Sequence, residues 1–218
     1  MKIAILGGSF NPLHIGHAML ADVIVHEMNY DKVLFVPTCN PPHKEITAHV
    51  TTKQRVEMVR QFCDSVGDGK FELEPCEIER GGISYTIDTL QFIIEKYKNQ
   101  IEGKPALLMG EEIAAEFSKW KEPYKVASLS DLIIVPRYPD FYGHVTKIAK
   151  NRPTGNYLGD FNVRFDKAKF EYPHKYLDIP ILTVSSTEIR ARVASNKSYK
   201  YLVPKSIYEF IEKENLYK

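Results

Sequence analysis

The sequence predicts an α/β fold built on a doubly wound parallel sheet, in a three-layer α/β/α arrangement. Short aliphatic runs alternate with amphipathic stretches at least five times along the 218 residues, which is typical of β-α-β units. Clusters of Gly, Ser, Thr and His directly follow several of these runs, where ligand-binding loops of this class lie. A chain of this length buries roughly 70% of its unfolded surface. We therefore expect one domain over residues 1–218.

The aliphatic runs are the expected strands. The first, residues 2–6, ends at Gly7-Gly8, as a buried strand does before a tight turn. Val36 and Val135 are each followed by a proline, which ends a strand. The remaining strands are expected at 32–36, 71–78, 106–109, 132–135 and 181–184.

The amphipathic stretches are the expected helices. In residues 51–66, for example, Val56, Val59 and the pair Phe62/Cys63 share one side. The other helices are expected at 15–28, 87–97, 111–120, 205–216 and from 187 to about 194, so the chain ends in helices that start at 187. Residues 138–180 are rich in aromatics and prolines and show no clear period. We expect a surface insertion there, with one further strand around 163–170.

Charge and cysteine content exclude several classes of protein. Lys and Arg total 29 against 28 Asp and Glu, a formal charge of +1, so nothing draws the whole chain to nucleic acid or to a membrane. No apolar run reaches the ~20 residues that span a bilayer. The three cysteines are widely spaced without a CxxC pair, which argues against a zinc module or disulfide framework and indicates a cytoplasmic protein.

The strongest local signal lies between the first strand and the first helix. It reads Gly7-Gly8-Ser9-Phe10-Asn11-Pro12-Leu13-His14-Ile15-Gly16-His17. Glycines let the backbone approach a ligand, and a helix N-terminus offers free N–H groups and partial positive charge. His14 and His17 can therefore both reach one anion. The run has neither the third glycine of a dinucleotide fingerprint nor a Walker lysine, and no nearby Cys or carboxylate completes a metal site.

A second cluster, Ser185-Ser186-Thr187-Glu188-Ile189-Arg190, follows the strand expected at 181–184. Ser185 and Glu188 have the spacing of a capping box, so a helix should start here. Its free amides and hydroxyls make another anion site. Helical side chains lean toward the N-terminus of the helix, so Arg190 can fold back over that site. Taken alone, plain helix capping with a surface arginine is the more common arrangement.

Three weaker features stand elsewhere in the chain. Pro41-Pro42-His43-Lys44 follows the second expected strand, and alone it is only a basic loop. Ser84-Tyr85-Thr86-Ile87-Asp88-Thr89 leads into a helix, and alone it is only a good helix start. Trp120 is the one tryptophan, and flanked by lysines it is more often partly buried than a ligand platform.

Together these motifs resemble the nicotinate-nucleotide adenylyltransferase family, within the HxGH nucleotidyltransferase superfamily. The run 7–17 is similar to the signature loop, 41–44 to the second-loop motif, 84–90 to the pyridine-nucleotide motif and 185–190 to the C-terminal ATP motif. The resemblance covers most of the chain and implies a Rossmann-like nucleotidyltransferase fold. It also implies adenylyl transfer from ATP to nicotinate mononucleotide, giving deamido-NAD and pyrophosphate in NAD biosynthesis.

The resemblance implies a role for each matching residue. The implied catalytic residues are His14, His17, Lys44 and Arg190. The implied ATP contacts are Gly7, Gly8, Ser9, Phe10, His14, His17, Gly110, Glu112, Ser186, Thr187 and Arg190. The implied contacts of nicotinate mononucleotide are Ser9, Phe10, Asn11, Lys44, Tyr85, Thr86 and Trp120. The implied cofactor is Mg²⁺, which bridges phosphates and takes no assigned protein ligand.

Elementary chemistry agrees with this reaction. A phosphate monoester has a second pKa of about 6, so the nucleophile is largely dianionic at neutral pH and needs no general base. Two polyanions must meet, so positioning and charge compensation should supply nearly all of the catalysis.

The sequence departs from the family pattern at two places, and several alternatives are open. Glu112 stands where the family usually has an aspartate, and residues 138–181 match no motif. The acceptor could instead be nicotinamide mononucleotide or pantetheine phosphate, by adenylyl or cytidylyl transfer. The chain could also be a non-catalytic nucleotide-binding regulatory module. A homo-oligomer is open as well, because aromatics in the insertion could form an interface.

Overall fold

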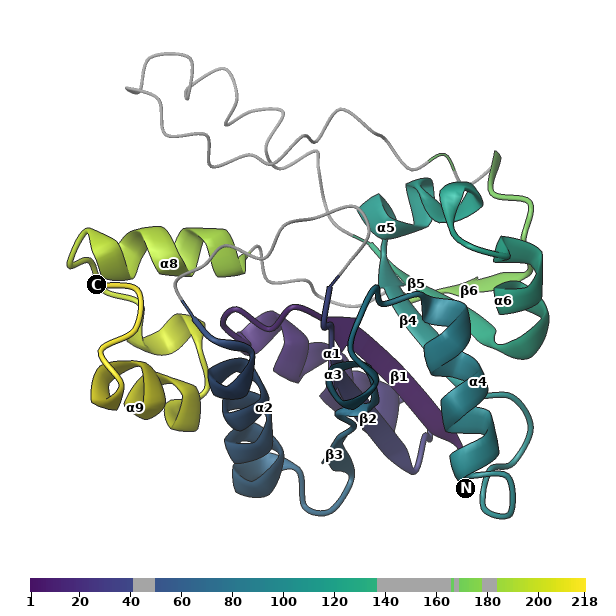
Figure 1. Ribbon diagram of the computed structural model, residues 1–218, viewed down its shortest axis with the longest axis horizontal. Helices are drawn as coiled ribbons and strands as arrows, with labels where there is room; N and C mark the ends of the chain where they lie inside the picture. Colours follow the sequence, from purple (N-terminus) through teal and green to yellow (C-terminus); the bar gives the residue numbers. More distant parts are fainter. Residues whose placement is uncertain (41–49, 137–165, 167–168, 178–183) are drawn as a thin grey trace.

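The computed structural model describes residues 1–40, 50–136, 166, 169–177 and 184–218 (Figure 1). Its sheet contains six parallel strands in the order β3-β2-β1-β4-β5-β6. The strands are β1 (Ile3–Gly8), β2 (Lys32–Pro37), β3 (Phe71–Leu73), β4 (Ala106–Gly110), β5 (Asp131–Val135) and β6 (His174–Tyr176). The chain winds outward from β1 to one side and returns to the other, which confirms the predicted doubly wound sheet.

Helices cover both faces of the sheet because side chains alternate along each strand. In β1, Ala4 and Leu6 join one buried cluster, while Ile3 and Ile5 join a second. The first cluster packs against α1 (Ile15–His26), α2 (Thr52–Val66), α8 (Ser186–Ala194) and α9 (Lys205–Lys213). The second packs against α3 (Cys76–Arg80), α4 (Thr86–Lys96), α5 (Glu111–Ala115) and α6 (Pro123–Leu129). The three-layer prediction is confirmed.

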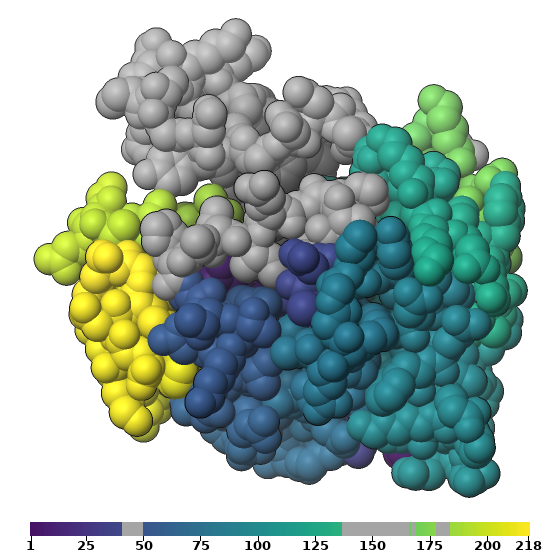
Figure 2. All heavy atoms as spheres, viewed as in Figure 1, coloured from purple at the N-terminus to yellow at the C-terminus, as the bar shows by residue number. Residues whose placement is uncertain are grey.

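The C-terminal helices lie on the α2 side of the molecule. The space-filling view shows the yellow C-terminal segment directly against the blue surface of α2 (Figure 2). The Ser65 hydroxyl at the end of α2 donates to Ser206 Oγ on α9 at 3.1 Å. Within the described residues, no helix is long and apolar enough to cross a membrane.

Two predicted elements are about half their expected length or less, and the helices predicted at 15–28 and 205–216 end two or three residues early, at His26 and Lys213. The strand predicted at 71–78 ends at Leu73, because Glu74 accepts the N–H of Cys76 and the chain turns into α3 after Pro75. The helix predicted at 111–120 ends at Ala115 and is followed by a 3-10 turn at Phe117–Lys119. The unpredicted α6 then begins with a proline in its first turn, where the missing N–H costs nothing.

The edge strand β6 lies inside the segment predicted as a surface insertion, 138–180. It pairs with β5, and the Tyr176 hydroxyl donates to Glu111 at the start of α5. Its three residues, His-Lys-Tyr, carry too short a pattern to indicate a strand. The strands predicted around 163–170 and at 181–184 fall mostly outside the described residues.

Candidate active site

The switch point of the sheet lies between β1 and β4. Beyond it, the connections leave in opposite directions, and ligands of such sheets bind at the carboxyl ends of these strands. Leu6 pairs with Leu108, so the ends of the two strands lie at the same edge. The β1–α1 loop (residues 9–14) and the segment that follows Gly110 both start there.

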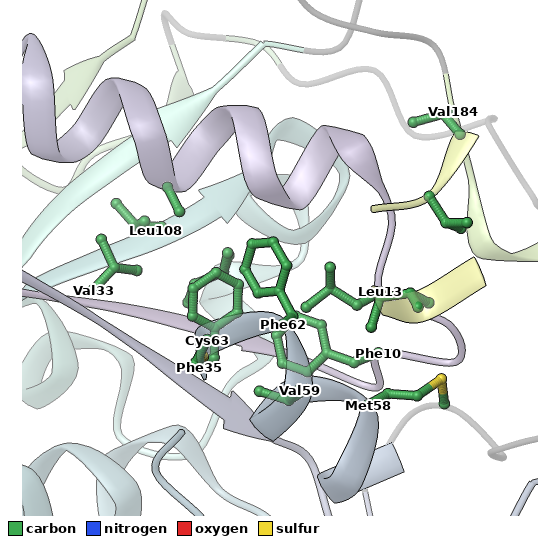
Figure 3. Close-up of a cluster of buried hydrophobic side chains, with 14 of the residues drawn as sticks. Phe10, Leu13, Val33, Phe35, Met58, Val59, Phe62, Cys63, Leu108 and Val184 are labelled. Carbon is green, nitrogen blue, oxygen red and sulfur yellow. The ribbon is translucent and has the colours of Figure 1, made fainter. Parts of the chain in front are cut away.

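An apolar underside anchors the β1–α1 loop. Phe10 and Leu13 are fully buried and pack toward Phe62 of α2 and Phe35 of β2 (Figure 3). Phe10 has a φ of 44°, a left-handed conformation that is uncommon for a non-glycine residue. A Cβ on Gly8 would lie 3.2 Å from the Phe10 ring, so the glycine leaves room for this turn. The core thus fixes the loop that carries the predicted site.

The two predicted histidines stack on each other at the start of α1. Their ring centroids are 3.8 Å apart with an interplanar angle of 29°. The backbone N–H of His14, the N-cap residue, donates to His17 Nδ1 at 3.2 Å. In a neutral ring this bond leaves the proton of His17 on Nε2, so Nε2 is a hydrogen-bond donor. The Phe10 and His17 rings meet in an edge-to-face arrangement with their centroids 5.2 Å apart, and this contact helps to orient His17.

The start of α8 contacts the same loop, so the two strongest predicted motifs come together. The Ser186 hydroxyl donates to the Pro12 carbonyl at 2.8 Å, and Arg190 Nη1 donates to the Asn11 carbonyl at 2.6 Å. Arg190 Nη2 donates to Thr187 Oγ1 at 3.2 Å, which confirms that this side chain folds back toward the N-terminus of its helix. Burial lowers the pKa of the Arg190 guanidinium.

Two further side chains hold this loop, and neither is among the residues predicted from the sequence. Arg55 of α2 is 1% exposed and donates through Nη1 to the Ser9 carbonyl at 2.8 Å. The Tyr217 hydroxyl donates to Asn11 Oδ1 at 2.8 Å. A signal for Arg55 existed, because it stands three and four residues before buried Met58 and Val59. The predicted stripe placed Val56 on the buried side, but Val56 is only half-buried.

The segment that begins at Ser84 contacts the exit of β2 and the neighbour of Trp120, whereas residues 41–44 lie outside the described residues. Ser84 Oγ accepts the backbone N–H groups of Cys39 and Asn40, at 3.1 and 3.3 Å, and ties the exit of β2 to this helix. Tyr85 is the N-cap residue, and Thr86 begins the helix. Lys121 Nζ lies 4.6 Å from the centre of the Tyr85 ring, and its neighbour Trp120 is half-buried against Phe117, with ring centroids 4.9 Å apart.

Glu112 folds back over the end of β4. It lies in the first turn of α5, and a Cβ on Gly110 would come within 2.9 Å of its Oε2. A carboxylate therefore stands at the switch point. Lys44 lies outside the described residues. The part of the chain that the structure describes contains no group of three or more His, Cys, Asp and Glu side chains arranged to hold a metal ion.

The N-termini of α1 and α8 meet at the β1–α1 loop, beside the switch point of the sheet. This arrangement defines a protein of the cytidylyltransferase-like class, and the family of that description matches residues 5–192. A protein from Borrelia garinii subsp. bavariensis is 36% identical over 217 residues, 100% of this chain and 95% of the relative. One from Dictyoglomus thermophilum is 36% identical over 218 residues, 100% of both chains. Both are named "Probable nicotinate-nucleotide adenylyltransferase". The chain belongs to the nicotinate-nucleotide adenylyltransferase family.

Solved structures agree on the fold. The nicotinic acid mononucleotide adenylyltransferase of Plasmodium falciparum, complexed with NaAD, has a TM-score of 0.68 at 22% identity, covering 99% of this chain and 97% of that one. A putative nicotinate-nucleotide adenylyltransferase from Vibrio parahaemolyticus has a TM-score of 0.65 at 19% identity, covering 100% and 96%. These similarities show a shared Rossmann-like architecture.

Proposed function

We propose that this chain transfers the adenylyl group of ATP to nicotinate mononucleotide, forming deamido-NAD and pyrophosphate for NAD biosynthesis. The observation that carries the proposal is the meeting of α8 with the β1–α1 loop beside the stacked His14 and His17. Hydroxyl, guanidinium and imidazole donors thereby gather where a triphosphate needs them. The names of the relatives supply the identity of the two substrates.

The proposed reaction is a displacement at the α-phosphorus of ATP. A phosphate oxygen of nicotinate mononucleotide forms the new P–O bond, and the bond from the α-phosphorus to the bridging oxygen of pyrophosphate breaks. No proton must be removed from the nucleophile. The bond from His14 N–H to His17 Nδ1 fixes the tautomer of His17, so its Nε2 carries the proton. A hydrogen bond from Nε2 then offsets the negative charge that grows on the α-phosphoryl oxygens.

The other proposed roles follow the positions of the residues. Arg190, Ser186 and Thr187 hold the β- and γ-phosphates at the start of α8. Tyr85, Thr86 and Trp120 bind the nicotinate group by stacking and N–H donation, and Glu112 lies near the nucleotide ribose. The remaining proposed contacts with the two substrates come from Lys44, from Asn11, and from the backbone of Gly7, Gly8, Ser9, Phe10 and Gly110.

MgATP is the proposed form of the first substrate, since Mg²⁺ prefers phosphate and water oxygens to an all-protein cage. Removing Mg²⁺ with EDTA should abolish pyrophosphate release, and added Mg²⁺ should restore it. We also propose that the protein is cytoplasmic, because Cys39, Cys63 and Cys76 are all free thiols.

Acceptor choice is the most direct test of the proposed function. We expect kcat/KM for nicotinate mononucleotide to exceed that for nicotinamide mononucleotide by about tenfold or more, because donors set for a carboxylate leave a carboxamide poorly paired. Pantetheine phosphate should release no pyrophosphate from ATP. A preference for the amide would change the proposed acceptor. If no acceptor releases pyrophosphate, the chain is not the enzyme that we propose.

Gly16→Ala should impair turnover through crowding of His14. The added Cβ would lie 3.2 Å from the His14 ring and 3.3 Å from Val184. A shift of about 1 Å in a catalytic group can cost roughly 10²-fold in rate. We therefore expect kcat to fall by at least about tenfold. Asp22→Ala, at an exposed position of α1, is the control and should keep wild-type kcat. If Gly16→Ala keeps the wild-type kcat, the position of the His14 ring does not matter for turnover and the prediction is wrong.

A further inference from the structure

Arg55 is the one charged residue among the buried side chains of α2. The others on that face are Met58, Val59, Phe62 and Cys63. Figure 3 shows Met58, Val59 and Phe62 gathered around Phe10 of the β1–α1 loop. Arg55 precedes Val59 by one helical turn, and its Nη1 reaches the Ser9 carbonyl. The guanidinium therefore lies directly against the proposed catalytic loop, although no proposed catalytic role includes it.

The partners of Arg55 are neutral. Nη1 bonds to the Ser9 carbonyl, Nη2 lies 3.4 Å from Thr52 Oγ1, and within the described residues Nε has no hydrogen-bond partner. Buried guanidinium groups are ordinarily paired with carboxylates, because an isolated buried charge is costly. On the same helix, exposed Arg60 is paired with Glu57. Burial lowers the pKa of Arg55, but arginine still remains protonated at neutral pH.

A second cation, which belongs to α8, bonds to the same loop. Half-buried Arg190 donates to the Asn11 carbonyl and to Thr187, which are also neutral groups. Within the described residues, two guanidinium groups thus hold the Ser9 and Asn11 carbonyls of one loop, and neither bonds to a carboxylate. Such a site has an unbalanced positive field, which a polyanionic ligand can balance.

We propose that Arg55 is a positioning residue of the β1–α1 loop and that the phosphates of bound ATP balance its buried charge. This inference rests on the proposed function. Arg55 contributes in two ways, since it holds the Ser9 carbonyl in place and it attracts the triphosphate through the loop. The free protein thereby tolerates an unfavourable buried charge that becomes favourable when the nucleotide binds.

Three variants separate charge from packing. Arg55→Met removes the charge and keeps a long apolar side chain, Arg55→Lys keeps the charge and loses the planar fork, and Arg60→Met is the exposed control on α2. Circular dichroism checks folding, and titration calorimetry measures Kd for MgATP, MgADP and AMP.

We expect Arg55→Met to weaken MgATP by about ten- to hundredfold, with a smaller loss for MgADP and the least for AMP. Arg55→Lys should stay within about threefold of wild type for MgATP, and so should Arg60→Met. A purely structural role would weaken all three nucleotides equally.

Each outcome is decisive. Equal losses for the three nucleotides, or Arg55→Met within about twofold of wild type for MgATP, would overturn the inference. If Arg55→Met does not fold, a loss of about tenfold or more in the folded Arg55→Lys variant overturns it instead. Failure of the wild-type protein to bind MgATP would count against the proposed function itself.

Discussion

Replacing His17 with alanine is expected to lower kcat by at least about 10²-fold, because one transition-state donor is worth roughly 10²–10³ in rate. The variant loses Nε2, the nitrogen that the bond from His14 N–H leaves as a donor. It also loses the ring that stacks on His14 at 3.8 Å. The KM for ATP should change much less than kcat, since the donation strengthens as charge grows on the α-phosphoryl group.

The matched control for this variant is His26→Ala, at the other end of α1. The His26 side chain is 60% exposed and lies 3.4 Å from the carboxylate of Asp22. We expect its kcat and melting temperature to equal those of the wild type. Steady-state kinetics with MgATP and nicotinate mononucleotide measure both variants. If His17→Ala turns over at nearly the wild-type rate, its assignment as the transition-state donor is wrong.

Arg190→Ala is expected to lower kcat/KM for ATP by about 10²–10³-fold, because two functions disappear together. The guanidinium supplies positive charge at the start of α8, and its Nη1 holds the Asn11 carbonyl at 2.6 Å. Arg190→Lys should recover part of the loss through its charge alone, since an ammonium group cannot bond to both Asn11 and Thr187 in the same planar geometry.

Arg192→Ala is the control for Arg190, on the same helix. Arg192 pairs with Glu188 at 2.9 Å and is 38% exposed. Its loss should leave kcat/KM for ATP unchanged, because partly exposed ion pairs contribute little. Equal kinetics for Arg190→Ala and Arg192→Ala would show that Arg190 does not bind the phosphates.

The central strands were predictable because their residues are buried on both faces. β1 and β4 are continuous aliphatic runs that end in glycine, and no other structure suits such runs at this length. β6 was not predictable, because three residues at a sheet edge, of which none is fully buried, are too few to show a hydrophobic alternation. α6 was missed because its start depends on Pro123 following Glu122, whose φ of 53° no periodicity indicates.

The residues of the candidate site likewise divide into those that the sequence predicts and those that it does not. His14 and His17 were evident from their spacing in the sequence, since they are three residues apart at the start of the helix that follows β1. The contact between Ser186 and Pro12 joins residues 174 positions apart, which only the topology or a family resemblance can bring together. Arg55 was missed because an amphipathic pattern assigns charged residues to the solvent face of a helix. Here the guanidinium is buried instead, and it donates a hydrogen bond to the Ser9 carbonyl of the loop.

The most direct test of the account is a crystal structure of the chain with Mg²⁺ and a non-hydrolysable ATP analogue. It should place the triphosphate between the first turns of α1 and α8, with His17 Nε2 within hydrogen-bonding distance of an α-phosphoryl oxygen and Arg190 bound to the terminal phosphates. An analogue bound elsewhere, with both imidazoles directed away from its phosphates, would contradict the account.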